Sequence, residues 1–200
     1  MGAPADVWDY IRFGCLFCHG YEERGLPSSG ILASAHSGDP AIALHLSRMA
    51  SRLTDKVTIY TNGADDAAAT LHDLLANEKG GRAGAIAVDN RRLVRLECGS
   101  GHPSEIIINF EDGSSETQGF LVHQPHMTIA GPFAKQLELE LTPTGDVKAT
   151  PPFYETSMPG VFAVGDCATP LKAVSQALAM GAFAAAGLVF QLGAELAKIE

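Results

Sequence analysis

The beginning of the chain carries apolar positions at two different spacings. Residues 31–35 form a short apolar run, and residues 56–60 alternate apolar with polar side chains, as buried strands do. Between them, apolar residues recur at helical spacing over 41–53, directly after Pro40, which suits the first position of a helix. A strand, a helix and a second strand within about 30 residues predict one β-α-β unit.

The segment that follows predicts a helix and then several short strands. Helical spacing runs over 67–79 and ends at Gly80-Gly81, a typical helix stop. Short apolar segments come next, separated by turn residues such as Asp89-Asn90 and Glu111-Asp112-Gly113. We expect this strand-rich part to lie as a meander on the β-α-β core. Its strands are expected at residues 85–88, 93–98, 105–110 and 120–122.

The last third of the chain predicts fewer strands and one long helix. A short helix is expected at 130–137 and a hairpin at 139–147. Residues 160–166 have the pattern of a buried strand that ends in Gly-Asp. An Ala-rich helix over 173–198 follows, and its small residues let another backbone come close. A strand, Gly-Asp and a helix start in this order offer backbone amides to an anionic group of a ligand.

Composition and charge narrow the class of protein. With 46% hydrophobic and 18% charged residues, the 200-residue chain can bury a core. The net charge of −9 without a basic block argues against nucleic acid and anionic membrane as partners. No apolar run is expected to reach membrane-spanning length, and the first residues lack the pattern of a signal peptide. We therefore expect a cytoplasmic protein.

The most concentrated chemistry is a C-x-x-C followed at once by histidine, Cys15-Leu16-Phe17-Cys18-His19. Two thiols at this spacing can close a disulfide across one turn, and a helix N-terminus acidifies the first of them. The same pattern attaches haem in exported chains, and a zinc site would need ligands beyond the isolated Cys98 and Cys167. Two half-buried cysteines without a role also fit. The pattern favours a redox dithiol, and no metal site is expected.

Three motifs in a fixed order resemble one protein class. They are the segment from Cys15 to Glu22, the strand-turn-helix around Ser37-Gly38-Asp39, and Gly160-Val-Phe-Ala-Val-Gly-Asp166. This order resembles thioredoxin-reductase-like flavoproteins of the pyridine nucleotide-disulfide oxidoreductase class. With Tyr60-Thr61-Asn62-Gly63 after the second strand, it looks most like the fungal branch that contains gliotoxin-type dithiol oxidases. The resemblance covers nearly all of this chain but only the later part of the family's length.

The resemblance implies a role for each matching residue. Cys15 and Cys18 match the redox pair, with Cys18 as the thiol that faces the flavin. His19 stands where thioredoxin reductases place an acid, which makes it the candidate general acid/base. His123 and His126 are weaker candidates to assist, because Pro125 between them also fits a plain turn. The residues that match flavin contacts are Gly165, Asp166, Lys172, Ala173 and Val174.

The chain also departs from the family pattern. The G-x-G-x-x-G loop that holds the FAD pyrophosphate occurs nowhere in the sequence, so the FAD site in this chain is expected to be incomplete. His36 stands at a glycine position of the second nucleotide loop, and residues 61–66 lack the basic cluster that holds a 2′-phosphate. NADPH is therefore an unlikely cofactor by sequence. We expect FAD, bound with help from elsewhere.

Together these points predict an α/β fold with two parts. Residues 1–122 are expected to form a three-layer, Rossmann-like dinucleotide-binding domain with a β-meander, which carries the C-x-x-C. Residues 123–200 are expected to be the remnant of a second, FAD-binding domain. A homodimer or a partner chain would then complete the FAD site.

Two functions follow from this interpretation. The first is a flavin-linked thiol-disulfide oxidoreductase that acts on a small dithiol or other metabolite in fungal secondary metabolism. The alternative is a truncated, non-redox relative that reuses the fold as a scaffold or as a biosynthetic enzyme of the isomerase or cyclase type. The paired cysteines and Gly165-Asp166 favour the first function, whereas the lost dinucleotide loops favour the second.

Overall fold

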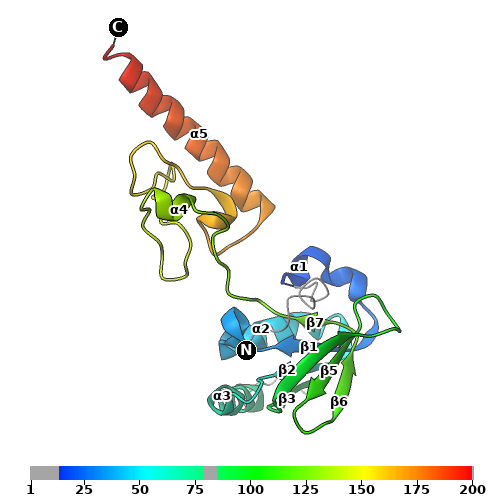
Figure 1. Cartoon of the computed structure of the whole chain (residues 1–200). Coiled ribbons are helices and arrows are strands. Elements are labelled where there is room, and N and C mark those ends of the chain that lie inside the picture. The colour runs from blue at the N-terminus through cyan, green and yellow to red at the C-terminus, as the bar shows by residue number, and fades with distance from the viewer. Residues whose placement is uncertain (1–13, 79–84, 200) are drawn as a thin grey trace. The chain divides into compact units, whose positions relative to one another are not determined.

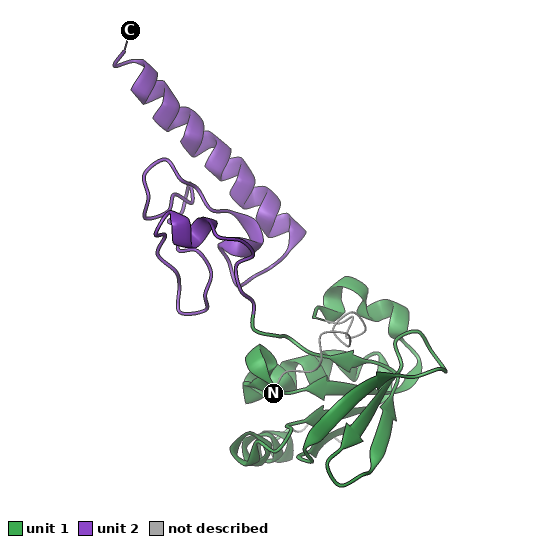
Figure 2. Cartoon of the chain, in the orientation of Figure 1, with its two compact units in different colours: residues 1–126 green, residues 127–200 purple. Residues whose placement is uncertain are grey.

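The computed structural model describes residues 14–78 and 85–199 (Figure 1). It divides into two compact units, Met1–His126 and Met127–Glu200, which are coloured separately in Figure 2. Each unit is described by itself below.

Two sequence-based expectations fall outside the described residues. One is the extended lead-in over 1–13, with Trp8, Tyr10 and Phe13 as anchors. The other is the helix stop at Gly80-Gly81.

Unit 1 is built on a four-stranded, all-parallel sheet in the order β3-β2-β1-β7. Leu32 pairs with Tyr60 on one side of β1, and Ile31 pairs with Val122 on the other. The buried, mainly apolar side chains of its central strands are typical of parallel strands covered on both faces. The strands are β1 (Leu26–Leu32), β2 (Thr54–Tyr60), β3 (Ile86–Asp89) and β7 (Leu121–Val122).

Helices cover one face of the parallel sheet. Helix α2 begins where the sequence places an acceptor for free backbone N–H groups: Asp39 accepts from the amides of Ala41 and Ile42, and Pro40 needs no such bond. The β-α-β unit expected from the sequence is confirmed. The helical segments are α1 (Leu16–His19), η2 (Gly20–Glu23), η3 (Ala35–Gly38), α2 (Pro40–Ala50) and α3 (Asp65–Ala76).

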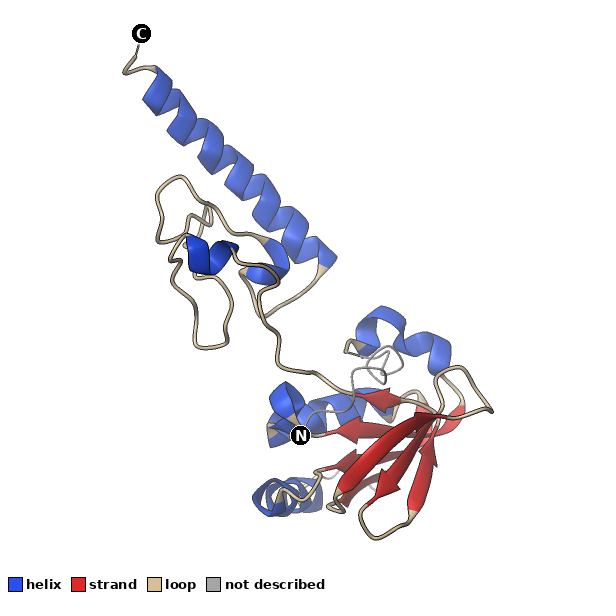
Figure 3. Ribbon diagram, viewed as in Figure 1, coloured by secondary structure: helices blue, strands red, loops and turns tan. Residues whose placement is uncertain are grey.

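A three-stranded antiparallel sheet, in the order β4-β5-β6, covers the other face (Figure 3). One core lies between the helices and the parallel sheet, and a second core joins Leu32, Tyr60 and Leu121 to the meander. The α/β class with a β-meander is therefore confirmed. The meander strands are β4 (Leu93–Cys98), β5 (Ile106–Phe110) and β6 (Ser115–Gln118).

The sequence misplaced one strand and missed another. The structure starts β1 at Leu26, five residues before the apolar run at 31–35 that was expected to be the strand. Ser29 is buried there because its hydroxyl pairs with that of Thr54 at 2.8 Å, and a Cβ on Gly30 would lie 2.7 Å from a Leu121 methyl. Strand β6 was not expected, because its residues are polar and lack an apolar alternation.

Unit 2 has little regular structure before its last helix. A bridge between Leu141 and Val147 confirms the expected hairpin. The buried strand expected at 160–166 is wrong: Phe162 makes a single bridge to Glu155, because the described residues offer this segment no neighbouring strand. The helical elements are α4 (Phe133–Gln136), η5 (Gly165–Cys167) and α5 (Val174–Leu196).

Helix α5 is apolar on nearly all sides. Met180, Ala184 and Gly187 are buried within unit 2, whereas Val189 and Phe190 are each 73% exposed. A continuous exposed apolar face of this kind is unusual on a soluble monomer.

By length and composition α5 could cross a membrane, since it has 23 residues and a mean hydropathy of 1.7. The expectation that no apolar run reaches that length is therefore wrong. Irregular backbone packs along this same helix, with Gly165 against Ala177 and Phe153 against Gly187. These contacts cover little of the helix, since only 17% of its most apolar window is buried within unit 2.

Candidate functional site

The structure joins Cys15 and Cys18 in a disulfide across the first turn of α1. Their Cα atoms are 5.5 Å apart, and the Cys18 amide donates to the Cys15 carbonyl. Both cysteines are exposed, whereas Leu16 between them points into the core. The pairing predicted from spacing is thus observed, at a position open to solvent and to a reactant.

The segment that carries the disulfide is anchored at its next turn. Gly20 lies so close to Leu16 and Leu53 that a Cβ there would be 3.1 Å from a methyl of each. The Gly25 amide donates to the Leu53 carbonyl at 2.8 Å, which ties the segment to the end of α2. His19, the last residue of α1, is exposed beside the pair. Cys15, Cys18 and His19 therefore form one exposed cluster in unit 1.

The loop after β1 makes its hydrogen bonds within the protein. The amides of His36 and Ser37 both donate to the Gln124 carbonyl, at 3.2 and 3.4 Å. The Asp39 carboxylate accepts from the first amides of α2. Phosphate groups of dinucleotides use donors of this kind, at this position of the fold. Here those donors are already bonded.

The side chain of His123 contacts the same loop. It is buried, and its Nδ1 lies 3.2 Å from both the Ser37 hydroxyl and the Leu32 carbonyl. Burial lowers the pKa of His123, more than the hydrogen bond to Leu32 raises it. The ring is therefore neutral at physiological pH and serves as a structural hydrogen-bonding group. His126 is the last residue of unit 1.

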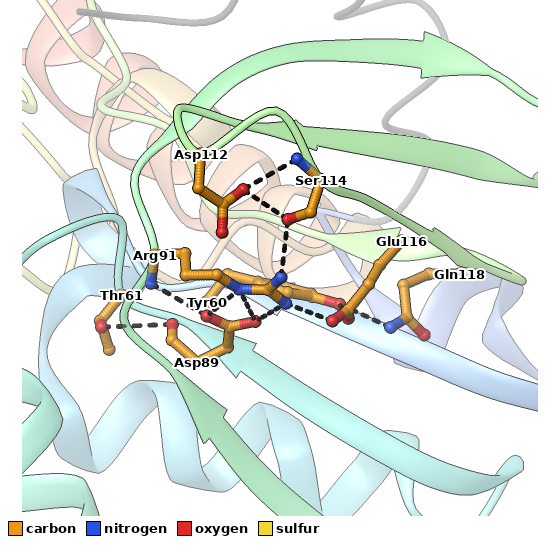
Figure 4. A network of polar contacts seen from close by, with 8 residues as sticks. All are labelled: Tyr60, Thr61, Asp89, Arg91, Asp112, Ser114, Glu116 and Gln118. Atoms are coloured by element: carbon orange, nitrogen blue, oxygen red, sulfur yellow. Dashed lines mark hydrogen bonds and ion pairs between the residues drawn. The ribbon is translucent and has the colours of Figure 1, made fainter.

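Polar and charged groups at the ends of β2 and β3 are paired with groups of the meander (Figure 4). The Arg91 guanidinium bonds Asp89 and Glu116, and the Tyr60 hydroxyl donates to Glu116 at 2.9 Å. Burial raises the pKa of Tyr60, and the hydrogen bonds from Arg91 lower the pKa of Asp89 against the opposing effect of its burial. This network ties the meander to the parallel sheet. Its other members are Thr61, Asp112, Ser114 and Gln118.

A cavity of about 350 Å³ lies within unit 2. It is lined by Asp166 and Lys172, two of the residues predicted to contact flavin, and by Cys167. Gly165 has a φ of +70°, which favours glycine, and its Cα lies so close to Ala177 that a Cβ would be 3.3 Å from it. The remaining lining residues are Met127, Thr128, Ile129, Ala130, Gly145 and Asp146.

The Lys172 ammonium fixes the turn that presents Asp166. It donates to Asp146 at 3.0 Å and to the carbonyls of Asp166 and Thr169 at 2.6 and 3.0 Å, which uses all three of its protons. Burial opposes ionisation of Asp146, but the bonds from Lys172 and Thr144 outweigh it, so the pKa of Asp146 lies below its usual value. Lys172 is thus engaged within the protein, while Asp166, which lines the cavity, is exposed.

The start of α5 completes this second cluster. Ala173 is the N-cap residue and has no side chain that could accept from the first amides of the helix, and Val174 is exposed. Sequence reasoning missed Asp146, because Thr144-Gly145-Asp146 has the composition of a plain turn. Its burial, and so its pairing with Lys172, is visible only in the folded unit.

The described residues contain no group of three or more His, Cys, Asp or Glu side chains arranged to hold a metal ion. The two clusters, around the disulfide in unit 1 and around Asp166 in unit 2, are the candidate sites.

Comparison with known proteins adds the chemistry of relatives. No protein-family model matches the chain. It is 42% identical over 198 residues to thioredoxin reductase sirT of Leptosphaeria maculans, which covers 96% of this chain and 59% of that protein. Thioredoxin reductase aclD of Aspergillus oryzae is also 42% identical, over 94% of this chain and 58% of its own length. The chain resembles part of a thioredoxin reductase.

A solved structure supports the same conclusion for the fold. An oxidoreductase from Agrobacterium tumefaciens is 27% identical and superposes with a TM-score of 0.69, over 89% of this chain and 55% of that one. The chain thus spans a little more than half the length of the relatives it matches. Its similarity is to fungal thioredoxin reductases, a family of FAD oxidoreductases.

Proposed function

We propose that this chain is the disulfide-bearing part of a flavin-linked thiol-disulfide oxidoreductase of the thioredoxin-reductase type. The observation that carries the proposal is the exposed Cys15–Cys18 disulfide, followed at once by His19. The similarity to fungal thioredoxin reductases over nearly the whole chain supports it. We place the protein in the cytoplasm.

The substrate is a small molecule with two thiols, and it is oxidised by exchange with the cysteine pair. One substrate thiolate attacks Sγ of Cys15, the disulfide breaks, and its electron pair leaves on Sγ of Cys18. His19 supplies a proton to that thiolate. The second substrate thiol then attacks the substrate sulfur of the mixed disulfide and releases Cys15. Two electrons and two protons pass from the substrate to the cysteine pair, and the substrate leaves as a disulfide.

The surface around the disulfide favours a substrate with apolar parts. Phe17 stands between the two cysteines and is 93% exposed, and Tyr21 follows one turn later at 68% exposure. The Arg24 guanidinium lies 4.1 Å from the centre of the Tyr21 ring and holds it in place. An apolar metabolite can bury both rings when it approaches the sulfurs. This arrangement suits a dithiol of secondary metabolism.

FAD, when bound, would accept the two electrons from the reduced cysteine pair. Unit 2 fits one end of such a cofactor: Asp166 offers a carboxylate to hydroxyl groups at the cavity, and the start of α5 offers amides that no side chain caps. The sequence has no glycine-rich loop for the pyrophosphate. The fit is therefore partial, and further polypeptide must hold the other end.

We place that further polypeptide on the exposed face of α5. Leu178, Val189 and Phe190 lie there without a charged neighbour on the helix until Glu195. The fungal relatives have about two-fifths of their length outside the matched region, which is enough for a nucleotide-binding half. The proposed partner is a polypeptide that carries this half; a second copy of the chain, giving a homodimer, is the other outcome of the test.

NADPH is not proposed as the electron donor at unit 1. The amides of His36 and Ser37 are bonded to Gln124, and the Asp39 carboxylate stands at the start of α2. A phosphate there would have to displace a carbonyl and approach a negative charge. Calorimetry with millimolar NADPH should show no binding. Micromolar affinity would contradict this and would make a reductase the better proposal.

A non-redox enzyme or scaffold is the second candidate function. The self-bonded loop after β1 favours it, because a domain that no longer binds a dinucleotide has lost one part of the reductase machinery. Conversion of a metabolite by a variant in which Cys15 and Cys18 are both replaced by serine would support this candidate over the first.

The first test of the redox role is differential alkylation read by mass spectrometry. Reduced protein should expose two more thiols than mildly oxidised protein, and both should map to Cys15 and Cys18. Cys98 and Cys167 are the internal control, because both are free thiols and should alkylate in either state. Full alkylation of all four cysteines after oxidation would remove the redox proposal.

The second test concerns the flavin. The chain alone should be colourless, without flavin absorbance near ~450 nm. Mixing with FAD and a complementary nucleotide-binding half should restore the colour. Asp166→Ala should abolish that gain, while Glu195→Ala, an exposed carboxylate on the same unit, should leave it. A yellow, stoichiometric protein from this chain alone would contradict the partial-site argument.

A further inference from the structure

A buried carboxylate lies five residues after Cys18, at the end of the segment that carries the disulfide. Glu23 closes η2 and is 8% exposed. Its Oε1 accepts from the hydroxyl of Ser104, at 2.8 Å, and Ser104 is itself buried. Its Oε2 accepts no hydrogen bond. An ionised oxygen without a donor in a buried position is costly, so this geometry calls for a nearby proton.

His102 is placed to supply that proton. Its Nδ1 lies 3.4 Å from Oε2 of Glu23 and 3.3 Å from the backbone amide of Ser104. These two neighbours favour opposite protonation states of Nδ1. An unprotonated Nδ1 accepts from the Ser104 amide, and a protonated Nδ1 donates to the Glu23 carboxylate.

The loop between β4 and β5, residues 99–105, is shaped around this contact. Glu105 folds back across it and accepts from the Gly101 amide at 3.0 Å, and a Cβ on Gly99 would collide with the Glu105 carboxylate. The Glu105 amide donates to the His102 carbonyl at 2.9 Å, so this loop carries a second carboxylate close in the chain to His102. Arg24 follows Glu23 in the chain, and its guanidinium lies over the Tyr21 ring.

We propose that protonated His102 fastens the 99–105 loop to Glu23, and that this latch positions the Cys15–Cys18 pair. Segment 16–23 is held at one end by the disulfide and at the other by Glu23. With the latch closed, the segment stays ordered after reduction, so each thiol has a higher effective concentration near the other. The closed latch therefore favours the disulfide. Acid pH strengthens the latch, because only protonated His102 donates to Glu23. Glu23 and His102 are positioning residues, and their redox effect rests on the proposed function.

The test measures the equilibrium between the cysteine pair and glutathione at pH 5.5 and 7.5, by thiol quenching and mass spectrometry on the full chain. Between these two pH values, the equilibrium constant of the unaltered protein should change about fivefold more than that of His102→Asn, the low end of couplings between sites. Glu23→Gln should match His102→Asn. His72→Asn, on the exposed surface of α3, should match the unaltered protein. Identical profiles in all four proteins would overturn the coupling.

The latch has its own readout in oxidised protein. At pH 5.5, His102→Asn and Glu23→Gln should each lower the free energy of unfolding in urea, and the double variant should lose no more than either single one. At pH 8 the effect of His102→Asn should be smaller than at pH 5.5, because only a protonated Nδ1 donates to the carboxylate. Additive losses would overturn the latch. A pair that never exchanges with glutathione in any variant would overturn the proposed function and the coupling together.

Discussion

Unit 1 and unit 2 differ in how completely each satisfies its own residues. In unit 1, Ile31, Ile59 and Phe120 have no exposed surface, and apolar cores fill both faces of the parallel sheet. In unit 2, α5 buries Met180 and Ala184 but leaves most of its large apolar side chains in solvent. Unit 1 buries these large apolar side chains within itself, whereas unit 2 retains exposed apolar surface that association can bury.

The polar groups follow the same division. Donors in the loop after β1 are bonded to Gln124, and Arg91 is bonded to Asp89 and Glu116. In unit 2 the exposed Asp166 carboxylate lines a cavity. Groups that are already bonded have little to offer a ligand, since binding must first break those bonds. This difference supports the proposal that a cofactor contacts unit 2 and that the exposed disulfide is the reactive feature of unit 1.

The largest expected effect compares one substitution in the two units. Phe120→Ala should lower the free energy of unfolding of unit 1 by about 3–5 kcal/mol, because the side chain is fully buried. Phe190→Ala, at an exposed site on α5, should change stability by less than about 0.5 kcal/mol. Urea denaturation followed by circular dichroism measures both. Equal losses would show that α5 is already covered in the isolated chain.

The next effect concerns the ion pair that shapes the cavity. Asp146→Asn leaves the Lys172 ammonium without its carboxylate and should cost unit 2 about 2–3 kcal/mol, toward the low side of buried pairs because Lys172 is a quarter exposed. Since folding lowers the pKa of Asp146, its stabilisation is present above the unfolded value of about 4 and is lost as pH falls through the folded value. The variant should lose this acid sensitivity.

A matched pair on the surface provides the control for that prediction. Glu140 and Lys148 form an exposed ion pair at 2.8 Å in the same unit. Glu140→Gln should leave the unfolding curve unchanged at neutral pH, because solvent screens such pairs. If both variants lose the same stability, burial does not distinguish the two ion pairs.

A smaller effect is expected within the sheet of unit 1. Ser29→Ala removes a buried hydroxyl that pairs with Thr54 and should cost about 1 kcal/mol. The loss stays modest because the Thr54 hydroxyl also reaches the carbonyls of Ala50 and Lys56. Ser28→Ala, one residue earlier on the same strand, should be nearly neutral. The midpoint of urea unfolding, with unchanged slope, distinguishes the two variants.

The smallest effect on stability should accompany the largest effect on association. Val189→Glu puts a charge on the exposed face of α5 and should alter the unfolding free energy by less than about 0.5 kcal/mol. Binding of a complementary nucleotide-binding half, measured by light scattering, should be lost. Leu141→Glu, at an exposed apolar site that is not on α5, should still bind. Retained binding by Val189→Glu would place the docking surface elsewhere.

Local patterns predicted most of unit 1. Apolar spacing with Asp39-Pro40 at its start located α2, and the strands β3, β4 and β5 were found within one residue, whereas β6 was missed. The start of β1 was missed because Ser29 and Gly30 resemble a turn until Thr54 and Tyr60 are seen beside them. In unit 2 the expected strand at 160–166 failed, since a strand exists only where a neighbour accepts its hydrogen bonds.

By itself, the sequence determined the β-α-β core, the long closing helix and the C-x-x-C-H chemistry, because residue spacing and local caps govern these features. Only the tertiary structure decided which polar groups are already bonded. The Gln124 carbonyl on the loop after β1, Asp146 on Lys172 and Glu23 beside His102 all join residues distant in the chain. Hydrogen bonds of this kind depend on distance and burial in the folded units, which no local pattern encodes.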